Sequence, residues 1–253
     1  MISIKSDREI ALMREAGRIT ALAHKAVADA IRPGVTLKEL DDIAYQTITA
    51  AGAIPSFKGY EGFPGSICSS VNEVLVHGIP NEYALQEGDI VSIDIGACYK
   101  GYHGDCAYTH PVGQISLEAK KLLEVTQQSL YEGLKMVKPN NHLGDISHAI
   151  QSYAESFGYS LPIEFGGHGI GNELHEDPSI PNVGNPETGI VLKKGMCLAI
   201  EPMVNVGKPH TRVLKDGWTV VSKDRSLTAH FEHTVVITEE GYEILTTLPN
   251  KEG

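Results

Sequence analysis

Two aspartates, Asp94 and Asp105, each lie in a short apolar run, and a Lys-Gly turn separates the two runs. Paired carboxylates can hold a cation or share a proton. If the runs form one hairpin with its turn at Lys100 and Gly101, Asp94 lies opposite Ala107. Because side chains alternate between faces with a period of two, the two carboxylates then share one face as diagonal neighbours.

Two like charges on one face require a physical explanation. At about 4 Å they repel by roughly 4 kcal/mol at an effective dielectric constant near 20, so an unrelieved pair would destabilise the fold. A bound cation or a shared proton would remove this repulsion. The alternative is that one aspartate caps the turn while the other is solvated, and the hairpin alone leaves that choice open.

An internal repeat favours the cation. Residues between 31 and 52 match residues 106 positions later, and residues between 85 and 94 match residues 107 positions later. Constant offsets over about sixty residues indicate a duplication, which predicts a fold of two related halves. The position that corresponds to Asp94 is then another carboxylate, Glu201, and Glu232 in a later apolar run is the counterpart of Asp105.

The four carboxylates are thus predicted to face one another across a pseudo-twofold axis. Their charge of about −4 needs compensation in a partly desolvated cleft, and two divalent cations supply it. The simplest occupant is a binuclear metal centre, which lowers the pKa of a bridging water to near neutrality. Imidazoles are the other expected component, and His168 and His175 stand in or beside a predicted glycine-rich turn. Their spacing is too wide for an HExxH helix pair, which excludes a zincin.

The helices and strands that must position these groups follow from capping and periodicity. Capping boxes at Ser6 and Thr36 predict two helices, the first running up to Pro33-Gly34 and the second ending near Gly52. The corresponding elements of the second half come after the hairpin. The other expected elements are helices at about 117–137 and 143–157 and strands at 74–77, 196–200 and 230–237.

Composition indicates an ordinary globular protein. Hydrophobic residues make up 42% and charged residues 21% of the 253 residues, which argues against a disordered or fibrous chain. The formal net charge of −11 disfavours binding to DNA phosphates. The sequence contains neither an apolar run of membrane-spanning length nor a signal-peptide core, so we expect a cytoplasmic protein with no membrane partner. Four cysteines without C-x-x-C spacing are expected to be mostly buried free thiols.

Seven motifs occur in a specific order: Val76-His77-Gly78-Ile79-Pro80, Val91-Ser92-Ile93-Asp94, Gly104-Asp105, Gly167-His168-Gly169-Ile170-Gly171, Leu174-His175-Glu176, Ile200-Glu201-Pro202 and Glu232-His233-Thr234. Over nearly the whole chain they resemble the motifs of the methionine aminopeptidases, and the short interval between His175 and Glu201 is similar to that of compact type 1 enzymes. The resemblance implies an α+β protein with the pseudo-twofold pita-bread fold. In this fold, two helix-helix-strand halves surround a curved, mainly antiparallel sheet. We expect a single catalytic domain over residues 1–253, with halves at about 1–112 and 113–253.

The resemblance also implies a set of metal ligands. Asp94 and Asp105 would hold one metal ion and His168 and Glu201 the other, with Asp105 and Glu232 bridging the two. This mostly oxygen set with one imidazole suits Mn(II), Fe(II) or Co(II), and it also allows Zn(II). The donor types do not choose between these metals.

In the implied mechanism, a hydroxide that bridges the two metals attacks the carbonyl after the N-terminal methionine, and Glu201 carries its proton to the leaving amine. His175 would stabilise the developing oxyanion, and His77 would contact the scissile amide. The implied activity is removal of the initiator methionine from nascent proteins and peptides. A small second residue is expected, because a bulky one would clash near the metals.

A small apolar pocket for the methionine side chain is implied as well, with Tyr60, Phe63, Cys68 and Trp218 as its walls. Ordinary core packing would explain each of these residues separately. Leu174 departs from the family pattern, because members commonly carry an aromatic residue before the second histidine. Loss of that ring is expected to loosen one wall of the pocket.

The resemblance implies that the partners are the N-termini of peptides and nascent proteins. Contact with the ribosome near its exit tunnel stays open. We expect a monomer.

Three rival interpretations remain. An X-Pro peptidase of the same fold would usually carry an N-terminal domain, whereas the first repeat here begins almost at Met1. A non-catalytic binding homologue is disfavoured by the complete set of ligands. A structural cation site that joins the halves would show no chelator-sensitive amidase activity.

Overall fold

The structure is a computed structural model that describes residues 2–248. In this part of the chain four α-helices form two consecutive pairs: α1 (Asp7–Ala30) with α2 (Leu37–Ala50), and α3 (Leu117–Leu134) with α4 (Leu143–Ser156). Both predicted capping boxes are confirmed, because the side chains of Ser6 and Thr36 each accept a hydrogen bond from the backbone three residues later. Helix α3 ends before the predicted residue 137, since the backbone at 136 and 137 turns into i→i−3 hydrogen bonds.

The strands are short, and every pairing among them is antiparallel, which confirms the predicted α+β class. Their hydrogen bonding divides the described residues into four sheets, ordered β14-β13-β8-β6-β7, β1-β4-β2 with β5 paired to β4, β10-β11-β3 and β12-β9. The bounds are β1 (Ile54–Pro55), β2 (Ile67–Val71), β3 (Val74–Val76), β4 (Ile90–Tyr99), β5 (Tyr102–Pro111), β6 (Gly166–Gly169), β7 (Glu176–Pro181), β8 (Cys197–Ile200), β9 (Met203–Asn205), β10 (Thr211–Val213), β11 (Val220–Ser222), β12 (Thr228–His230), β13 (His233–Ile237) and β14 (Tyr242–Ile244).

The predicted hairpin is β4 and β5, and its register is confirmed. Asp94 pairs with Ala107, and Asp105 pairs with Gly96, two positions after Asp94. Lys100 and Gly101 form the turn with φ values of 49° and 83°, the left-handed pair that a two-residue hairpin loop requires. The two carboxylates therefore share one face of the hairpin, as the alternation of side chains predicts.

The two histidines of the glycine-rich motif stand in or beside a turn, as predicted: His175 lies in the turn at residues 171–175, and His168 lies just before it, in strand β6. Strand β6 runs between β7 and β8, and its glycines permit that close packing. A Cβ atom on Gly167 would lie 2.1 Å from the carbonyl oxygen of Ala199, and one on Gly169 would lie 2.1 Å from that of Asp177. The glycines thus serve strand packing and leave His168 as the single side chain directed into the interior from this strand.

The single strand predicted at 230–237 is wrong, because it is broken between β12 and β13. The backbone N–H of Glu232 donates to the carbonyl oxygen of Ala107 on β5, at 2.8 Å, and that of Phe231 donates to Pro202. Between β12 and β13 the backbone is therefore hydrogen-bonded to strand β5 of the hairpin. This bond places Glu232 next to β5.

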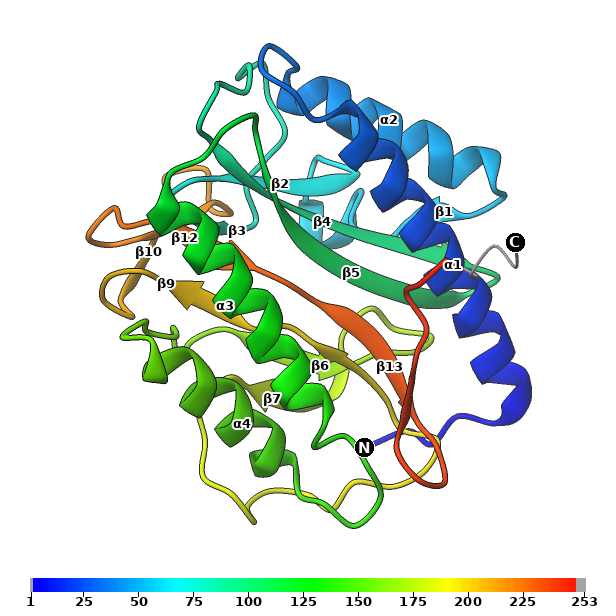
Figure 1. The fold of residues 1–253 in the computed structure, drawn as a ribbon. Helices are drawn as coiled ribbons and strands as arrows, with labels where there is room; N and C mark the ends of the chain where they lie inside the picture. The colour runs from blue at the N-terminus through cyan, green and yellow to red at the C-terminus, as the bar shows by residue number, and fades with distance from the viewer. Residues whose placement is uncertain (1, 249–253) are drawn as a thin grey trace, which may run out of the picture.

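The helices lie on one side of the strands (Figure 1), with α1 over β4 and β5, α2 beside α1, β1 and β2, and α3 and α4 beside β7, β9 and β12. Each helix pair buries its own apolar cluster, one containing Ile19, Leu40 and Ile93 and the other containing Leu122 and Leu198. The two pairs therefore hold separate groups of strands rigidly.

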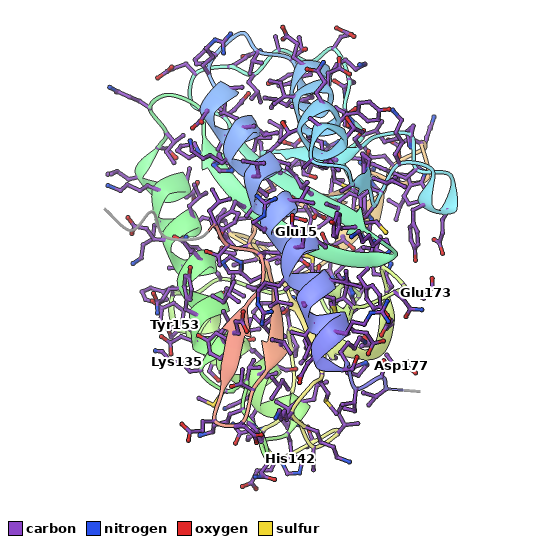
Figure 2. All side chains as sticks on the ribbon, turned by 90° about the vertical axis from the view of Figure 1, so that its right-hand side faces the viewer. Glu15, Lys135, His142, Tyr153, Glu173 and Asp177 are labelled. Atoms are coloured by element: carbon purple, nitrogen blue, oxygen red, sulfur yellow. The ribbon has the colours of Figure 1, made fainter. Side chains whose placement is uncertain are left out.

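A side view separates α3 and α4 from the loops around β7. Lys135 and Tyr153, which belong to the region of α3 and α4, lie at the edge opposite Glu173 and Asp177 (Figure 2). Of the four cysteines, Cys98 is partly exposed and the other three are buried, and all are free thiols as predicted. No helix in the described part of the chain combines the length and apolarity needed to cross a membrane.

Candidate active site

All of the residues that the sequence singled out line one cavity of about 650 Å³. They come from ten different strands or connecting segments, so only the folded chain brings them together. Both of the predicted halves contribute residues. The predicted residues in the lining are Tyr60, Phe63, Cys68, His77, Asp94, Asp105, His168, His175, Glu201, Trp218 and Glu232.

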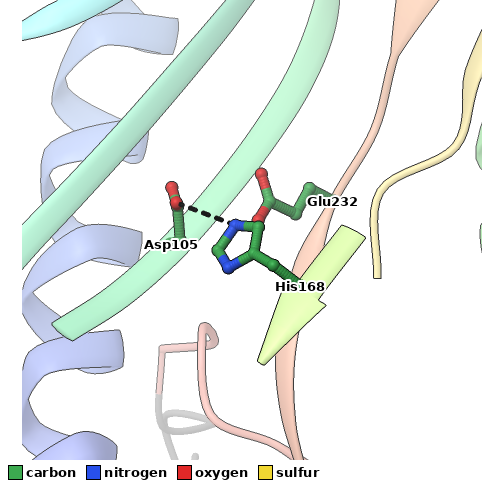
Figure 3. A group of neighbouring side chains, drawn as sticks. All are labelled: Asp105, His168 and Glu232. Atoms are coloured by element: carbon green, nitrogen blue, oxygen red, sulfur yellow. Dashed lines mark ion pairs between the residues drawn. The ribbon is translucent and has the colours of Figure 1, made fainter. Parts of the chain in front are cut away.

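The carboxylates converge around His168. Its Nε2 atom lies 3.3 Å from Oε1 of Glu201 and 3.9 Å from Oδ2 of Asp105. Figure 3 shows Asp105 on β5, His168 on β6 and Glu232 before β13 pointing toward one another. The ligand atoms of these three residues all lie within 4.8 Å of one another, a spacing that suits donors to a shared cation.

The cluster carries a large electrostatic penalty in the absence of a cation. Burial raises the pKa of Asp105 to about 7, and burial together with the charges of Asp105 and Glu201 raises the pKa of Asp94 well above its usual range. Burial also raises the pKa of Glu201 and of Glu232, with the charge of Asp105 adding to both. Within residues 2–248 no lysine or arginine lines the cavity, so a bound cation is the compensation that fits.

Two buried carboxylate oxygens without hydrogen-bond partners in the described part of the chain also support a bound cation. Oδ1 of Asp94 and Oε1 of Glu232 are buried and have no hydrogen-bond partner among the described residues. Buried carboxylate oxygens normally accept hydrogen bonds or bind cations, and leaving one unpaired is costly. The arrangement therefore fits divalent metal ions held mainly by oxygen, with one imidazole from His168.

Backbone contacts hold two of these ligands in place. The hydroxyl of Thr234 on β13 accepts a hydrogen bond from the N–H of Asp105 at 2.9 Å and donates to its carbonyl oxygen at 2.7 Å. Nδ1 of His168 donates to the carbonyl oxygen of Gly169 at 2.9 Å. Because that bond places the proton on Nδ1, Nε2 faces the carboxylates with a free lone pair. Burial lowers the pKa of His168 to about 3, so the ring is neutral.

The two accessory histidines lie beside this cluster. The ring of His175 lies 4.3 Å from that of His168, and its Nδ1 atom is hydrogen-bonded to the hydroxyl of Tyr60 at 2.8 Å. His77 follows β3 with a φ of 59° and packs edge-on against Trp218 at 6.4 Å. Burial and the nearby charge of His175 lower the pKa of His77 to about 4, so both rings are available as neutral hydrogen-bonding groups.

An apolar pocket adjoins the histidines. The rings of Phe63 and Trp218 meet edge-to-face at 5.1 Å, and Cys68 and Tyr60 belong to the same apolar cluster. Leu174 is only 2% exposed and lines the cavity too, where it packs in this cluster. The effect of the leucine on the tightness of the wall stays a prediction.

Among the cavity residues that the sequence analysis did not single out, one histidine lies next to the carboxylates. His230 is 2% exposed, and its Nε2 atom lies 3.5 Å from Oε2 of Glu201 and 3.9 Å from Oε2 of Glu232. A signal was present, since His230 lies two residues before Glu232 in a predicted strand and should share its face. Nothing else in the sequence distinguished His230 from the other histidines of the chain.

The chain matches the family model described as "Metallopeptidase family M24" over residues 11–239. It is 58% identical over 246 residues to "Methionine aminopeptidase 1" of Bacillus subtilis, covering 97% of this chain and 99% of that protein. The crystal structure of methionine aminopeptidase from Thermotoga maritima superposes with a TM-score of 0.96 at 48% identity, covering 98% of this chain and 100% of that chain.

More distant structures share the fold alone. The prolidase from Pyrococcus horikoshii has a TM-score of 0.79 at 24% identity, and the match covers 98% of this chain but 64% of the prolidase. The X-Pro peptidase alternative is therefore not favoured, and the pita-bread fold that the sequence implied is confirmed by the structural neighbours. With a family model that spans most of its length and relatives that match it from end to end, the chain belongs to metallopeptidase family M24.

Proposed function

We propose that this protein is a metal-dependent aminopeptidase that removes the N-terminal methionine from peptides and nascent proteins with a small second residue. The observation that carries the proposal is the convergence of four carboxylates, two of them with orphaned oxygens, beside an apolar pocket in one cavity. Membership of the metallopeptidase family and the high identity to methionine aminopeptidases agree with it.

The proposed ligand sets follow the two sides of the cluster. Asp94 and Asp105 would hold one divalent cation, His168 and Glu201 would hold the other, and Asp105 and Glu232 would contribute to both. When bound, such cations polarise a carbonyl and make water a nucleophile near neutral pH. We propose Mn(II), Fe(II) or Co(II) as occupants, with Zn(II) an alternative, because the set is rich in oxygen.

Side chains of the cavity supply the proton transfers. Glu201 lies at the edge of the cluster, 3.3 Å from Nε2 of His168, and we propose that it carries the proton of the attacking water to the leaving amine. If the hydroxyl of Tyr60 donates to Nδ1 of His175, the ring must carry its proton on Nε2. That N–H can then donate to the oxygen on which negative charge develops, while His77 contacts the amide.

The apolar pocket selects the first residue. Phe63, Cys68 and Trp218 form an apolar and polarizable wall of the kind that suits an unbranched thioether side chain. The carboxylate cluster lies directly beside this wall, so the second residue of the substrate meets the crowded part of the cavity. We therefore propose a preference for small second residues.

The wider organisation belongs to the same proposal. We propose one catalytic domain over residues 1–253, built of two related halves at about 1–112 and 113–253, each contributing carboxylates. We further propose that it acts as a cytoplasmic monomer on N-termini emerging from the ribosome. Analytical ultracentrifugation and binding to purified ribosomes are the direct tests of these two points.

The test of the activity is methionine release from Met-Ala-Ser with Mn(II) or Co(II) supplied. Asp94→Asn removes a metal ligand and His175→Ala removes the proposed oxyanion donor, so each should lower kcat/KM by about 100-fold or more. His110→Gln is the matched control, because His110 lies on the opposite face of β5 and outside this cavity.

Undiminished turnover in both Asp94→Asn and His175→Ala would contradict the site assignment. An X-Pro peptide, assayed in parallel, separates the two reactions that this fold supports. Turnover of that peptide in preference to Met-Ala-Ser would contradict the proposed substrate. Retained activity in excess chelator would instead favour a structural role for the cations.

A further inference from the structure

His230 is a buried group of the cavity to which neither the predicted ligand set nor the proposed proton transfers give a role. Its side chain lines the cavity at 2% exposure, and its Nε2 atom has no hydrogen-bond partner among residues 2–248. An unpaired buried imidazole nitrogen is costly unless a partner outside the protein satisfies it. The position of the ring identifies that partner.

The backbone of His230 is fixed on both sides by one side chain of the hairpin. The hydroxyl of Thr109 on β5 accepts a hydrogen bond from the N–H of His230 at 2.9 Å and donates to its carbonyl oxygen at 2.9 Å. Pairing with Met203 on β9 adds a second constraint. The ring is therefore presented to the cavity from rigid strands, as a metal ligand must be.

Glu201 lies between two imidazoles. Its Oε1 atom lies 3.3 Å from Nε2 of His168, and its Oε2 atom lies 3.5 Å from Nε2 of His230. The ligand atoms of Glu201, His230 and Glu232 all lie within 4.8 Å of one another. Donors at about 2.0 to 2.2 Å from one metal ion are themselves separated by roughly 3 to 4.4 Å, and these atoms have nearly that spacing.

A direct hydrogen bond does not explain the arrangement. An N–H group that donates to a carboxylate lies about 2.7 to 3.2 Å from its acceptor, whereas Nε2 of His230 is 3.5 Å and 3.9 Å from the two carboxylate oxygens. The nitrogen and both oxygens therefore face a common space without bonding one another. A cation in that space would satisfy all three.

We propose that His230 is a sixth metal-binding side chain, which would add a second imidazole to the cation that His168, Glu201 and Glu232 would hold. The inference rests on the proposed metal centre. A second nitrogen donor would make this position more selective for Zn(II) over Mn(II) than the oxygen-rich position at Asp94, because imidazole suits Zn(II) whereas carboxylates suit Mn(II). The two positions should consequently fill in a definite order.

Calorimetric titration of the metal-free protein with Co(II) tests this assignment. His230→Gln keeps an amide that can hydrogen-bond a carboxylate but removes the imidazole, so one of the two binding steps should weaken about tenfold or more. His110→Gln is the matched control, because it removes another imidazole whose Nε2 atom is buried and unpartnered, from the face of β5 that points away from the cavity. Both steps should be unchanged in His110→Gln.

Counting nitrogen donors around a bound Cu(II) probe provides a readout independent of activity. Pulsed electron paramagnetic resonance should detect two imidazoles in the parent, one in His168→Ala, and none in the double variant His168→Ala with His230→Gln. Circular dichroism checks that each variant is folded. If His230→Gln fails to fold, His175→Ala keeps the test decisive by removing the other imidazole beside His168: two imidazoles in that variant support the proposal, and one overturns it.

Two results would overturn the inference while leaving the metal centre intact. One is a single imidazole on Cu(II) in the parent, and the other is unchanged Co(II) affinity in folded His230→Gln. A parent that binds no divalent cation would instead overturn the proposed metal centre itself. The experiment therefore separates the two failures.

Discussion

Asp105 illustrates how strongly the site acts on a single side chain. It is 4% exposed, and burial raises its pKa to about 7, whereas an unfolded aspartate ionises near pH 4. The folded metal-free protein thus holds this proton more tightly than the unfolded chain does. Stability from this group is present below about pH 4 and is lost as the pH rises toward 7.

We therefore expect Asp105→Asn to stabilise the metal-free protein at high pH. The free energy of unfolding should exceed that of the parent at pH 8, by at most about 4 kcal/mol for a shift of roughly three pKa units, and the difference should shrink toward pH 4. Urea denaturation in chelator at pH 4, 6 and 8 measures it. The buried histidines titrate in both proteins and cancel in the comparison. A difference that does not vary with pH would contradict the assigned pKa.

At this scale the sequence revealed most of the site. The alternation of side chains and the two-residue turn were sufficient to pair Asp94 with Ala107, because both are local properties of the chain. The role of His230 could not be inferred in this way. Its distance to Glu201 depends on how β12 is bonded to Thr109, which is a contact between distant segments.

Among the elements, the segment before α1 has a direct connection to the site. Nζ of Lys5 lies 2.5 Å from Oε2 of Glu176, the first residue of β7 and the neighbour of His175. The side chains are 3% and 10% exposed, so this is a buried ion pair. It ties the N-terminal segment to the loop that carries His175.

Lys5→Met should therefore destabilise the protein by about 3 to 5 kcal/mol, because it leaves Glu176 buried without its partner. Lys194→Met is the matched control, since Lys194 forms an ion pair with Glu239 at the surface, where the loss of a solvated pair should change the stability little. Chemical denaturation of both variants measures the difference. Equal effects in the two variants would show that the pair at Lys5 does not anchor the loop.

Prediction of the elements succeeded where the signals were local. Capping boxes located the starts of α1 and α2, because the bonding residues are three apart in sequence. The break at Phe231 and Glu232 could not be predicted, since it depends on a hydrogen bond to Ala107 more than one hundred residues away. The strand at His168 was not predicted, because glycine usually marks turns, whereas Gly167 and Gly169 here permit close strand packing.

On the scale of the whole molecule, the cavity draws on both groups of strands that the helix pairs support. The hairpin β4–β5 supplies Asp94 and Asp105, and the later strands and their connections supply His168, Glu201 and Glu232. The repeat in the sequence predicted that carboxylates would come from both sides. The duplication itself stays a prediction, and so does the division into halves.

Stepwise metal addition to the chelated protein, with methionine release from Met-Ala-Ser measured at each step, tests the central claim most directly. The account predicts no release without metal, recovery as up to two equivalents of Mn(II) or Co(II) bind, and almost none at any metal concentration in Glu201→Gln. The unfolding temperature should rise along with activity, because the cations relieve the repulsion among buried carboxylates. Methionine release by the chelated protein, or undiminished release by Glu201→Gln, would contradict the account.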